Sequence, residues 1–314
     1  MTNRSAAPAL TRHTVGPNVW LARPGEDAAT LLRRFAPRAL RPDVLETEDA
    51  VGRAMLDELE AAGRATTGDI VIALLGGRGA QALHRLLGER SRRGELGLIS
   101  RLHVFTQDAL APLRPDNGFS FVRDFERLLG LDFFRQVKSF TTFRTDAGDL
   151  EAEVNRYVAR LAELGGLDIF FLGHGPEANA ASHLAYIKPG SGAAADDVAG
   201  LIPISSTILE HHVSKFKAGG SVVAEGDEAE CRAATHILTL GPAAILGAKR
   251  IVQSVVDAGT APAKKASYRR VLDTVLADDV DVRAKQLDEN PGLWVRLHPN
   301  VRSLILPDVL EGGH

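Results

Sequence analysis

The stretch Asp168–Tyr186, DIFFLGHGPEANAASHLAY, holds the transition that decides the fold. An apolar run ends at Leu172, a Gly-His-Gly turn follows, and Pro176 and Glu177 open an alanine-rich segment that we expect to be helical. A strand, a glycine turn and a helix start form the arrangement by which α/β proteins present polar groups to a small ligand.

The same alternation continues along most of the chain, where short apolar runs are separated by amphipathic segments. Strands that alternate with helices need crossover connections, and these give a mostly parallel sheet covered on both faces. We therefore predict an α/β protein, a Rossmann-like three-layer sandwich with a mostly parallel sheet. The expected strands are 69–75, 101–105, 137–143, 168–173, 198–204, 235–241, 250–256 and 301–307, and the expected helices include 27–40, 44–63, 79–94, 119–130, 150–166 and 262–277.

The chain divides into a short extension and one domain. Residues 1–25, rich in Pro, Arg and small side chains, are expected to be extended or poorly ordered, and residues 26–314 to form a single α/β domain. The N-terminus has no apolar core of a secretory signal, and no apolar run is long enough to span a membrane. These patterns predict a cytoplasmic protein without a membrane partner.

Composition and charge exclude several classes of partner. A net charge of -3 and a pI near 6.4, with no block of Lys or Arg, argue against a nucleic-acid partner. The single cysteine, Cys231, allows no intrachain disulfide and is expected to be a buried bystander. No HxxxH or HExxH spacing occurs, so we predict neither a metal site nor a cofactor.

The first strand end carries a glycine-rich turn, LLGGRGAQAL. Gly76, Gly77 and Gly79 permit a tight turn before a helix whose free N–H groups attract phosphate, and Arg78 can add a bidentate clamp. A plain strand-to-helix turn is the alternative. A dinucleotide site does not fit, because the spacing is wrong and no acidic residue ends a strand about 20 residues later.

The second strand end places a carboxylate over the open end of the sheet. Asp108 lies three residues after the apolar run in VFTQDALAPL. It can serve as a general base if burial raises its pKa toward neutrality. Position alone leaves open the alternative that Asp108 is a turn or helix cap.

The opening stretch offers four polar candidates. Glu177 falls in the first turn of the expected helix, where a carboxylate suits the helix dipole without any chemistry. Asn179 and His183 are four residues apart and would share a helix face. Asn179 cannot relay a proton as imidazole does. His174 lies in the turn itself, and a single histidine is more often structural.

Near the C-terminus, AGTAPAKKA places two lysines at an expected helix start. Lys264 or Lys265 there suits an anion, although a solvated lysine fits the pattern as well. His298, before Pro299, is expected to belong to a structural turn.

In order along the chain, these motifs resemble those of the glucosamine-6-phosphate deaminase and 6-phosphogluconolactonase family, from about Ala50 to Asp308. LLGGRGAQAL resembles the family's phosphate loop, and VFTQDALAPL resembles its acidic segment. FFLGHGPEANAA lies where the family has Gly-x-Gly-x-Asp-Gly-His-x-Ala, and LHPNVRSLIL is similar to its closing strand. The resemblance implies a sugar-isomerase-like α/β fold.

Carried over by position, the resemblance assigns roles to several residues. Asp108 corresponds to the deaminases' base, which moves a proton between C1 and C2 of an open-chain sugar. Lys265 best fits the phosphate lysine, with Lys264 the near alternative. Thr207 is at best a remnant of a Thr-Arg phosphate contact, for which Lys215 can partly substitute. The remaining substrate and phosphate contacts would be Gly76, Gly77, Arg78, Gly79 and Gly175.

The chain also departs from the family's pattern. Asn179 replaces the histidine that opens the sugar ring in deaminases and acts as base in lactonases, and Glu177 replaces an aspartate two residues before it. Ala109 replaces the second acid after Asp108. Lactone hydrolysis is the activity that the missing histidine disfavours most, because it needs a base to activate water.

These observations give two hypotheses. We favour a divergent sugar-phosphate or amino-sugar phosphate isomerase in which Asp108 moves the proton and Glu177, Asn179 or His183 assists. The alternative is a non-catalytic sugar-phosphate-binding sensor or partner protein. In both, the partner is a phosphorylated sugar, and by analogy the chain can form a homo-oligomer.

Overall fold

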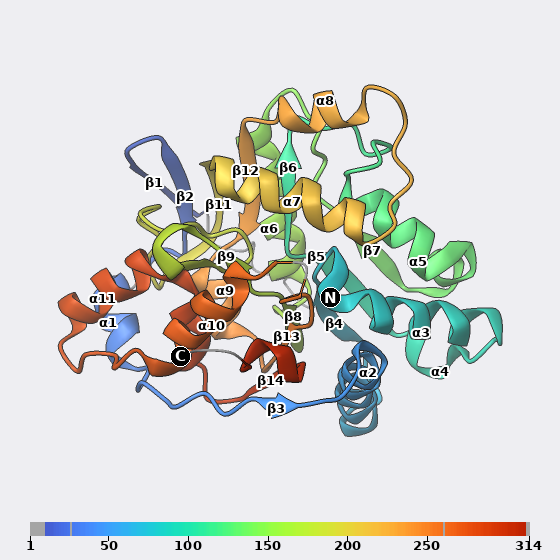
Figure 1. Cartoon of the computed structure of the whole chain (residues 1–314), viewed down its shortest axis with the longest axis horizontal. Coiled ribbons are helices and arrows are strands. Elements are labelled where there is room, and N and C mark those ends of the chain that lie inside the picture. Colours follow the sequence, from blue (N-terminus) through green and yellow to red (C-terminus); the bar gives the residue numbers. More distant parts are fainter. Residues whose placement is uncertain (1–9, 26, 260, 312–314) are drawn as a thin grey trace, which may run out of the picture.

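The computed structural model describes residues 10–25, 27–259 and 261–311 of the chain. Within these ranges the strands form a seven-stranded sheet, a five-stranded sheet and a short two-stranded ribbon. Helices flank the larger sheet, with α2 and α3 to its right and α10 and α11 to its left in Figure 1. The helices are α1 Ala28–Arg33, α2 Glu48–Ala65, α3 Gln81–Arg92, α4 Leu96–Ile99, α5 Phe121–Gln136, α6 Leu150–Glu163, α7 Ser206–Ala218, α8 Asp227–Arg232, α9 Pro242–Gly247, α10 Ala263–Asp273 and α11 Val280–Glu289.

The larger sheet is parallel throughout and has the order β3-β14-β13-β8-β4-β5-β7. Its central strands are apolar and buried on both faces, as a sheet covered by helices requires. The α/β class and the mostly parallel sheet predicted from the sequence are confirmed. The strands are β3 Asp43–Val44, β4 Ile70–Leu74, β5 Leu102–Thr106, β7 Ser139–Thr141, β8 Ile169–Leu172, β13 Arg250–Val255 and β14 Val301–Ile305.

The second sheet is antiparallel and has the order β1-β2-β11-β12-β6. Two expected strands, 198–204 and 235–241, belong to it and not to the parallel sheet, since β11 pairs antiparallel with β12 on one side and β2 on the other. The prediction of one mostly parallel sheet is therefore incomplete. The strands are β1 Thr11–Val15, β2 Asn18–Ala22, β6 Asp108–Ala111, β11 Asp197–Pro203 and β12 His236–Leu240.

The part of the N-terminal extension that the structure describes is a hairpin. β1 and β2 pair through the turn at Gly16, and Trp20 on β2 is fully buried. The hairpin thus joins the second sheet, whereas residues 1–9 of the expected extension lie outside the described residues. The division into an extension over 1–25 and a domain over 26–314 stays a prediction.

The helix expected after the Gly-His-Gly turn does not form. The chain instead runs through β9 Gly175–Pro176, a 3₁₀ turn at Ala178–Ala180 and β10 Ser182–His183, and β9 pairs antiparallel with β10. Asn179 and Ala180 have left-handed φ angles of 57° and 56°. A right-handed helix cannot pass through such residues, so the prediction that Asn179 and His183 share a helix face is wrong.

Side-chain caps begin the helices that flank the site. Thr47 accepts from Ala50 N at 3.1 Å before α2, and Ser120 accepts from Val122 N at 3.2 Å before α5. Ser205 accepts from Ile208 N at 3.1 Å before α7. Each cap satisfies an N–H group that the first turn leaves free.

His84 on α3 packs into the contact between α3 and α5, and its ring lies 5.0 Å from that of Phe125. The side chain is fully buried, and neither ring nitrogen has a hydrogen-bond partner among the described residues. Burial, with smaller effects from Arg85 and Arg127, lowers the pKa of His84 to about 3. The folded protein therefore holds this imidazole neutral.

We predict that His84→Leu raises the free energy of unfolding by about 1–3 kcal/mol at pH 7, because it removes unpaired buried nitrogens. Between pH 6.5 and 3 the unfolded chain binds a proton at His84 that the folded chain does not, so the wild type loses stability as the pH falls through this range. The variant should lose less. Urea denaturation at pH 7 and pH 5 measures both effects, and a variant less stable than the wild type at both pH values contradicts the prediction.

Candidate functional site

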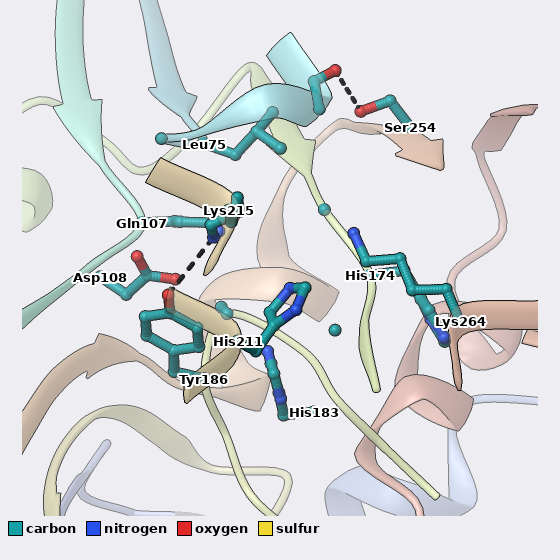
Figure 2. Close-up of a pocket in the computed structure, with 15 residues that line it drawn as sticks. Leu75, Gln107, Asp108, His174, His183, Tyr186, His211, Lys215, Ser254 and Lys264 are labelled. Carbon is teal, nitrogen blue, oxygen red and sulfur yellow. Dashed lines mark hydrogen bonds between the residues drawn. The ribbon is translucent and has the colours of Figure 1, made fainter. Parts of the chain in front are cut away.

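A cavity opens where four neighbouring strands of the parallel sheet end. Strands β5, β4, β8 and β13 are consecutive in the sheet, so the residues after their carboxyl ends meet at one edge. Figure 2 shows the side chains that converge there. The cavity is lined by Leu75, Gly76, Gly79, Gln107, Asp108, Gly173, His174, Gly175, His183, Ala185, Tyr186, His211, Lys215, Ser254 and Lys264.

Asp108 lies at the junction of the two sheets. Strand β5 ends at Thr106, and Asp108 begins β6, where it is paired with Thr239 of the antiparallel sheet. Its side chain is 1% exposed, and its Oδ1 has no hydrogen-bond partner among the described residues. A buried carboxylate oxygen that faces a cavity without a partner is the kind of group that a ligand completes.

The protonation of Asp108 is set mainly by its burial. Burial raises the pKa of the carboxyl to about 7, while the charge of Lys215 and a hydrogen bond from Gln107 act in the opposite direction. The condition stated for a general base, a pKa raised toward neutrality, is therefore met. The alternative of a turn or helix cap does not describe a residue that starts a strand.

Lys215 reaches the cavity from α7 and lies beside Asp108 in Figure 2. Its Nζ donates to the hydroxyl of Tyr186 at 3.3 Å and lies 5.4 Å from the centre of the Phe121 ring. Burial of the ammonium and the charge of Lys264 lower the pKa of Lys215 to about 8. A Cβ at Gly77 would approach Lys215 Cε to 2.7 Å, so this glycine gives the lysine its room.

The other lysine of the cavity is Lys264, on α10. Its Nζ forms an ion pair with Asp257, and both side chains are buried. Burial raises the pKa of Asp257, but the charges of Lys264, Lys215 and Arg78 outweigh it and hold that pKa below its ordinary value. Lys265, which the resemblance favoured, is half-buried and does not line the cavity. The structure therefore reverses the order of preference between the two lysines.

The glycine turn reaches the cavity only in part. Gly76 and Gly79 line it, but Arg78 is turned toward α2, where its Nη2 and Nε donate to Glu48 Oε1 at 2.7 and 3.1 Å. The N–H of Gly77 points to Asp124 Oδ2 at 3.3 Å. The bidentate phosphate clamp expected of Arg78 is thus already engaged by a carboxylate of the protein.

Thr207, the remaining residue expected at a phosphate, lies in the first turn of α7. It is half-buried and is not among the residues that line the cavity. The same helix brings His211 and Lys215 to the cavity one and two turns later.

His183 lines the cavity and forms a buried pair with Glu177, with Nδ1 and Oε1 3.4 Å apart. β10 places His183 directly opposite Gly175, and a Cβ at Gly175 would lie 1.6 Å from His183 Nε2. Glu177 also accepts from Ser205 Oγ at 3.2 Å. Burial lowers the pKa of His183, and Glu177 opposes the shift. The imidazole is therefore neutral with a carboxylate beside it.

Asn179 lies apart from His183. It is exposed, its carbonyl accepts from Arg270 Nη1 at 2.9 Å, and it lines a separate outer pocket that also includes Glu177 and Lys188. Of the three residues expected to lie together, Glu177 and His183 are therefore in contact and Asn179 is not. The reason is the left-handed turn, which directs Asn179 outward while the hairpin returns His183 to the strand end.

Two further histidines face the cavity. His174 Nε2 lies 2.8 Å from Ser267 Oγ, and its Nδ1 has no partner within the described part of the chain. The ring of His211 lies 5.9 Å from that of His183. Burial lowers the pKa of both residues well below the ordinary value, so both rings are neutral.

Sequence reasoning missed Tyr186, Gln107, Asp257 and a cavity role for His211. Tyr186 is the last residue of the stretch 168–186, and His211 and His212 are adjacent in the sequence. Neither observation shows where these side chains point in the folded protein. Tyr186 reaches the cavity only because the turn at Ala185 is left-handed.

His298, expected in a structural turn, is buried with Nε2 2.7 Å from Ala248 O, and Cys231 is buried as expected.

Within the described ranges no cluster of His, Cys, Asp and Glu is arranged to hold a metal ion. Among the described residues no helix is long and apolar enough to cross a membrane.

Comparison with known proteins finds similarity to enzymes named for sugar-phosphate substrates. No protein-family model matches it. A glucosamine-6-phosphate deaminase of Phocaeicola vulgatus is 27% identical over 113 residues, which is 35% of this chain and 40% of the relative's length. The aligned stretch thus spans well under two thirds of that enzyme.

Solved structures match over nearly the whole chain. A monomeric glucosamine-6-phosphate deaminase superposes with a TM-score of 0.64 at 19% identity, covering 86% of this chain and 98% of its own. The 6-phosphogluconolactonase of Trypanosoma brucei gives 0.60 at 19% identity, with 88% and 98% covered. These findings confirm the resemblance to the glucosamine-6-phosphate deaminase and 6-phosphogluconolactonase family, and the chain has that fold.

Replacing the buried carboxylate should stabilise the protein. In the folded state Asp108 binds its proton up to about pH 7, against an ordinary pKa of 3.8, so stability falls as the pH rises from about 4 to 7. We predict that Asp108→Asn raises the free energy of unfolding by about 2–4 kcal/mol above pH 7 and changes it little below pH 4. Denaturant unfolding at pH 4 and pH 8 tests this, with the exposed Asp116→Asn as control. An equal effect at both pH values would contradict it.

Proposed function

We propose that this chain, which has the fold of glucosamine-6-phosphate deaminases and 6-phosphogluconolactonases, is a sugar-phosphate isomerase of the amino-sugar type. In this proposal Asp108 moves a proton between C1 and C2 of an open-chain sugar. The observation that carries it is the buried, partly unpaired carboxylate of Asp108 at the strand ends, with a pKa near 7. Such a group is ionised often enough to accept a proton and basic enough to hold it.

The reaction begins with the proton on C2. The carboxylate of Asp108 takes this proton, the electron pair forms a C1–C2 double bond, and the carbonyl oxygen at C1 becomes an oxyanion. The oxyanion then takes a proton from the amine or hydroxyl on C2, and Asp108 returns its own proton to C1. If C2 carries an amine, the product is an imine, and water releases ammonia from it, whereas a hydroxyl at C2 gives a ketose.

The phosphate end of the ligand is assigned to the opposite side of the cavity. Lys264 lies there in Figure 2, across from Asp108, and Gly76 and Gly79 also line the cavity. Lys264 replaces Lys265 in this role because only Lys264 lines the cavity. Arg78 and Thr207 take no part, since Arg78 is paired with Glu48 and Thr207 lies outside the lining.

The pair of His183 and Glu177 is assigned to ring opening. A neutral imidazole can pass a proton between the ring oxygen and the C1 hydroxyl, and the carboxylate stabilises the imidazolium that forms. His183 thereby takes the place that Asn179 left without a titratable group. Because His183 lines the same cavity as Asp108 and Glu177 lies 3.4 Å behind it, the imidazole can act on the substrate that Asp108 deprotonates.

A non-catalytic sugar-phosphate-binding protein is the second candidate. The observation that favours it is the position of Asn179, which is exposed and holds no proton relay where the family has its histidine. In that case the cavity binds a ligand and stabilises the fold without turnover. Lactone hydrolysis is a third activity of this fold, and it exchanges no proton at C2.

Proton exchange at C2 decides between these candidates. Incubation with glucosamine-6-phosphate and with hexose 6-phosphates in deuterium oxide should incorporate deuterium at C2, as followed by NMR. We predict that Asp108→Asn lowers this rate by about 10²–10⁴-fold while ligand-dependent thermal stabilisation persists. The control is Asp116→Asn. Binding without exchange in the wild type supports the second candidate, and an Asp108→Asn variant with normal exchange refutes the assignment of the base.

The ring-opening pair makes a separate prediction. His183→Gln should lower turnover of cyclic substrates by about 10²-fold, and Gly175→Ala should do the same because its Cβ would displace the imidazole. Both should turn over an acyclic substrate analogue at near wild-type rate. His236→Gln, at a histidine outside the cavity, is the control. An equal loss on cyclic and acyclic substrates would show that the pair does not open the ring.

A further inference from the structure

Lys215 ends a chain of hydrogen bonds whose direction the structure fixes. His212 Nε2 lies 2.8 Å from Phe119 O, and a carbonyl only accepts, so Nε2 carries the hydrogen. Burial lowers the pKa of His212 to about 3, so the ring is neutral and its Nδ1 accepts. Tyr186 therefore donates its hydroxyl hydrogen to Nδ1 at 2.7 Å, and the tyrosine oxygen accepts from Lys215 Nζ at 3.3 Å.

The residue in the middle of this chain is held in a strained turn. Ala185 and Tyr186 have φ angles of 48° and 58°, and the flanking Leu184 and Ile187 exchange backbone hydrogen bonds at 2.8 and 3.3 Å. Turns with two left-handed central residues usually contain Asn or Gly. A backbone kept in this conformation with a tyrosine in it, next to a cavity, indicates that the position of the side chain matters.

The end of Lys215 lies on the Asp108 side of the cavity. Figure 2 shows Lys215 beside Gln107, Asp108 and Tyr186, with Lys264 across the cavity. The charge of Lys215 is the largest effect that opposes burial at Asp108. Among the described residues Lys215 has no carboxylate at ion-pair distance, whereas Lys264 is paired with Asp257. An ammonium has three hydrogens, and Tyr186 takes one, so the others can serve a ligand.

We infer that Lys215 is a catalytic residue that donates to the oxygen which becomes negative when Asp108 removes the proton, and that Tyr186 and His212 are positioning residues that hold it there. This inference rests on the proposed function. It gives Lys215 a different task from a phosphate contact, the role in which it was first considered. In the step itself the C2 proton goes to Asp108, the electron pair moves to the carbonyl oxygen, and the ammonium keeps its protons.

The chemistry explains why a lysine suits this position. A fixed cation next to the developing oxyanion stabilises the transition state more than the uncharged carbonyl of the substrate, and this difference accelerates the reaction. Tyr186 accepts a hydrogen bond from the ammonium and keeps it from folding back on Asp108. The two aromatic rings near the ammonium, of Phe121 and Tyr186, favour its charged form.

Two lysine variants distinguish the oxyanion role from a phosphate role. Lys215→Met should slow deuterium exchange at C2 by about 10²-fold or more and change the affinity for inorganic phosphate by no more than about two-fold. Lys264→Met should do the reverse and weaken phosphate binding by about ten-fold or more. Lys217→Met, two residues from Lys215 and on the surface, is the matched control. A loss of phosphate affinity in Lys215→Met as large as in Lys264→Met overturns the inference.

Tyr186→Phe tests the positioning residues. It removes the acceptor of Lys215, so kcat should fall by about ten-fold with KM within about two-fold. The titration midpoint of Lys215, followed by NMR of labelled lysine, should fall as well, because the ammonium loses a hydrogen bond. A purely structural tyrosine would lower the unfolding temperature and leave that midpoint unchanged, and such a result overturns its role.

The same titration separates this inference from the proposed function. If the wild type exchanges no proton in any sugar phosphate, the proposed function fails, but the electrostatic effect of Asp108 on Lys215 can still be measured. Asp108→Asn should lower the Lys215 midpoint from about 8, because a carboxylate that stabilises the ammonium is removed. An unchanged midpoint overturns the inference whatever the substrate tests show.

Discussion

The burial of Asp108 at the junction of the two sheets is the constraint on which the rest of the site depends. Strand β5 brings the chain to the rim of the parallel sheet, and β6 continues directly into the antiparallel sheet, so Asp108, the first residue of β6, is buried. Taking a carboxylate out of water is costly. Because burial disfavours the charged carboxylate, the protonated form of Asp108 persists to higher pH, and the pKa of the group rises to about 7.

The charges around the cavity preserve this balance. The two cations Arg78 and Lys264 each have a carboxylate of the protein beside them, Glu48 and Asp257, and the Gly77 N–H points to Asp124 Oδ2. If these cations were uncompensated, their field would lower the pKa of Asp108 and weaken it as a base. The compensation keeps the base strong, and it also implies that an anionic ligand meets a cavity with little net positive charge.

The sequence was sufficient for the strands and for the edge at which they meet, because apolar runs of strand length and glycine turns are local signals. It also placed Asp108 at that edge, because the residue follows closely on a strand end. It did not predict the second sheet, whose pairing joins segments far apart in the chain, or the left-handed turns at Asn179 and Tyr186. Those turns depend on tertiary packing, and they decide which side chains of one loop face the cavity. For a similar reason the sequence did not show that Lys264, and not Lys265, lines the cavity: adjacent helical residues point in different directions.

The hairpin of β9 and β10 shows how a proton-carrying group can be moved within a loop without moving the cavity. A histidine in the first turn of a helix reaches the strand end directly, whereas His183 reaches it by antiparallel pairing with Gly175, eight residues earlier. The pairing places the imidazole against the glycine, where a Cβ would lie 1.6 Å from Nε2. The two positions are therefore coupled by sterics. A larger residue at position 175 leaves no room for this histidine, so the position of the His183 imidazole requires the glycine.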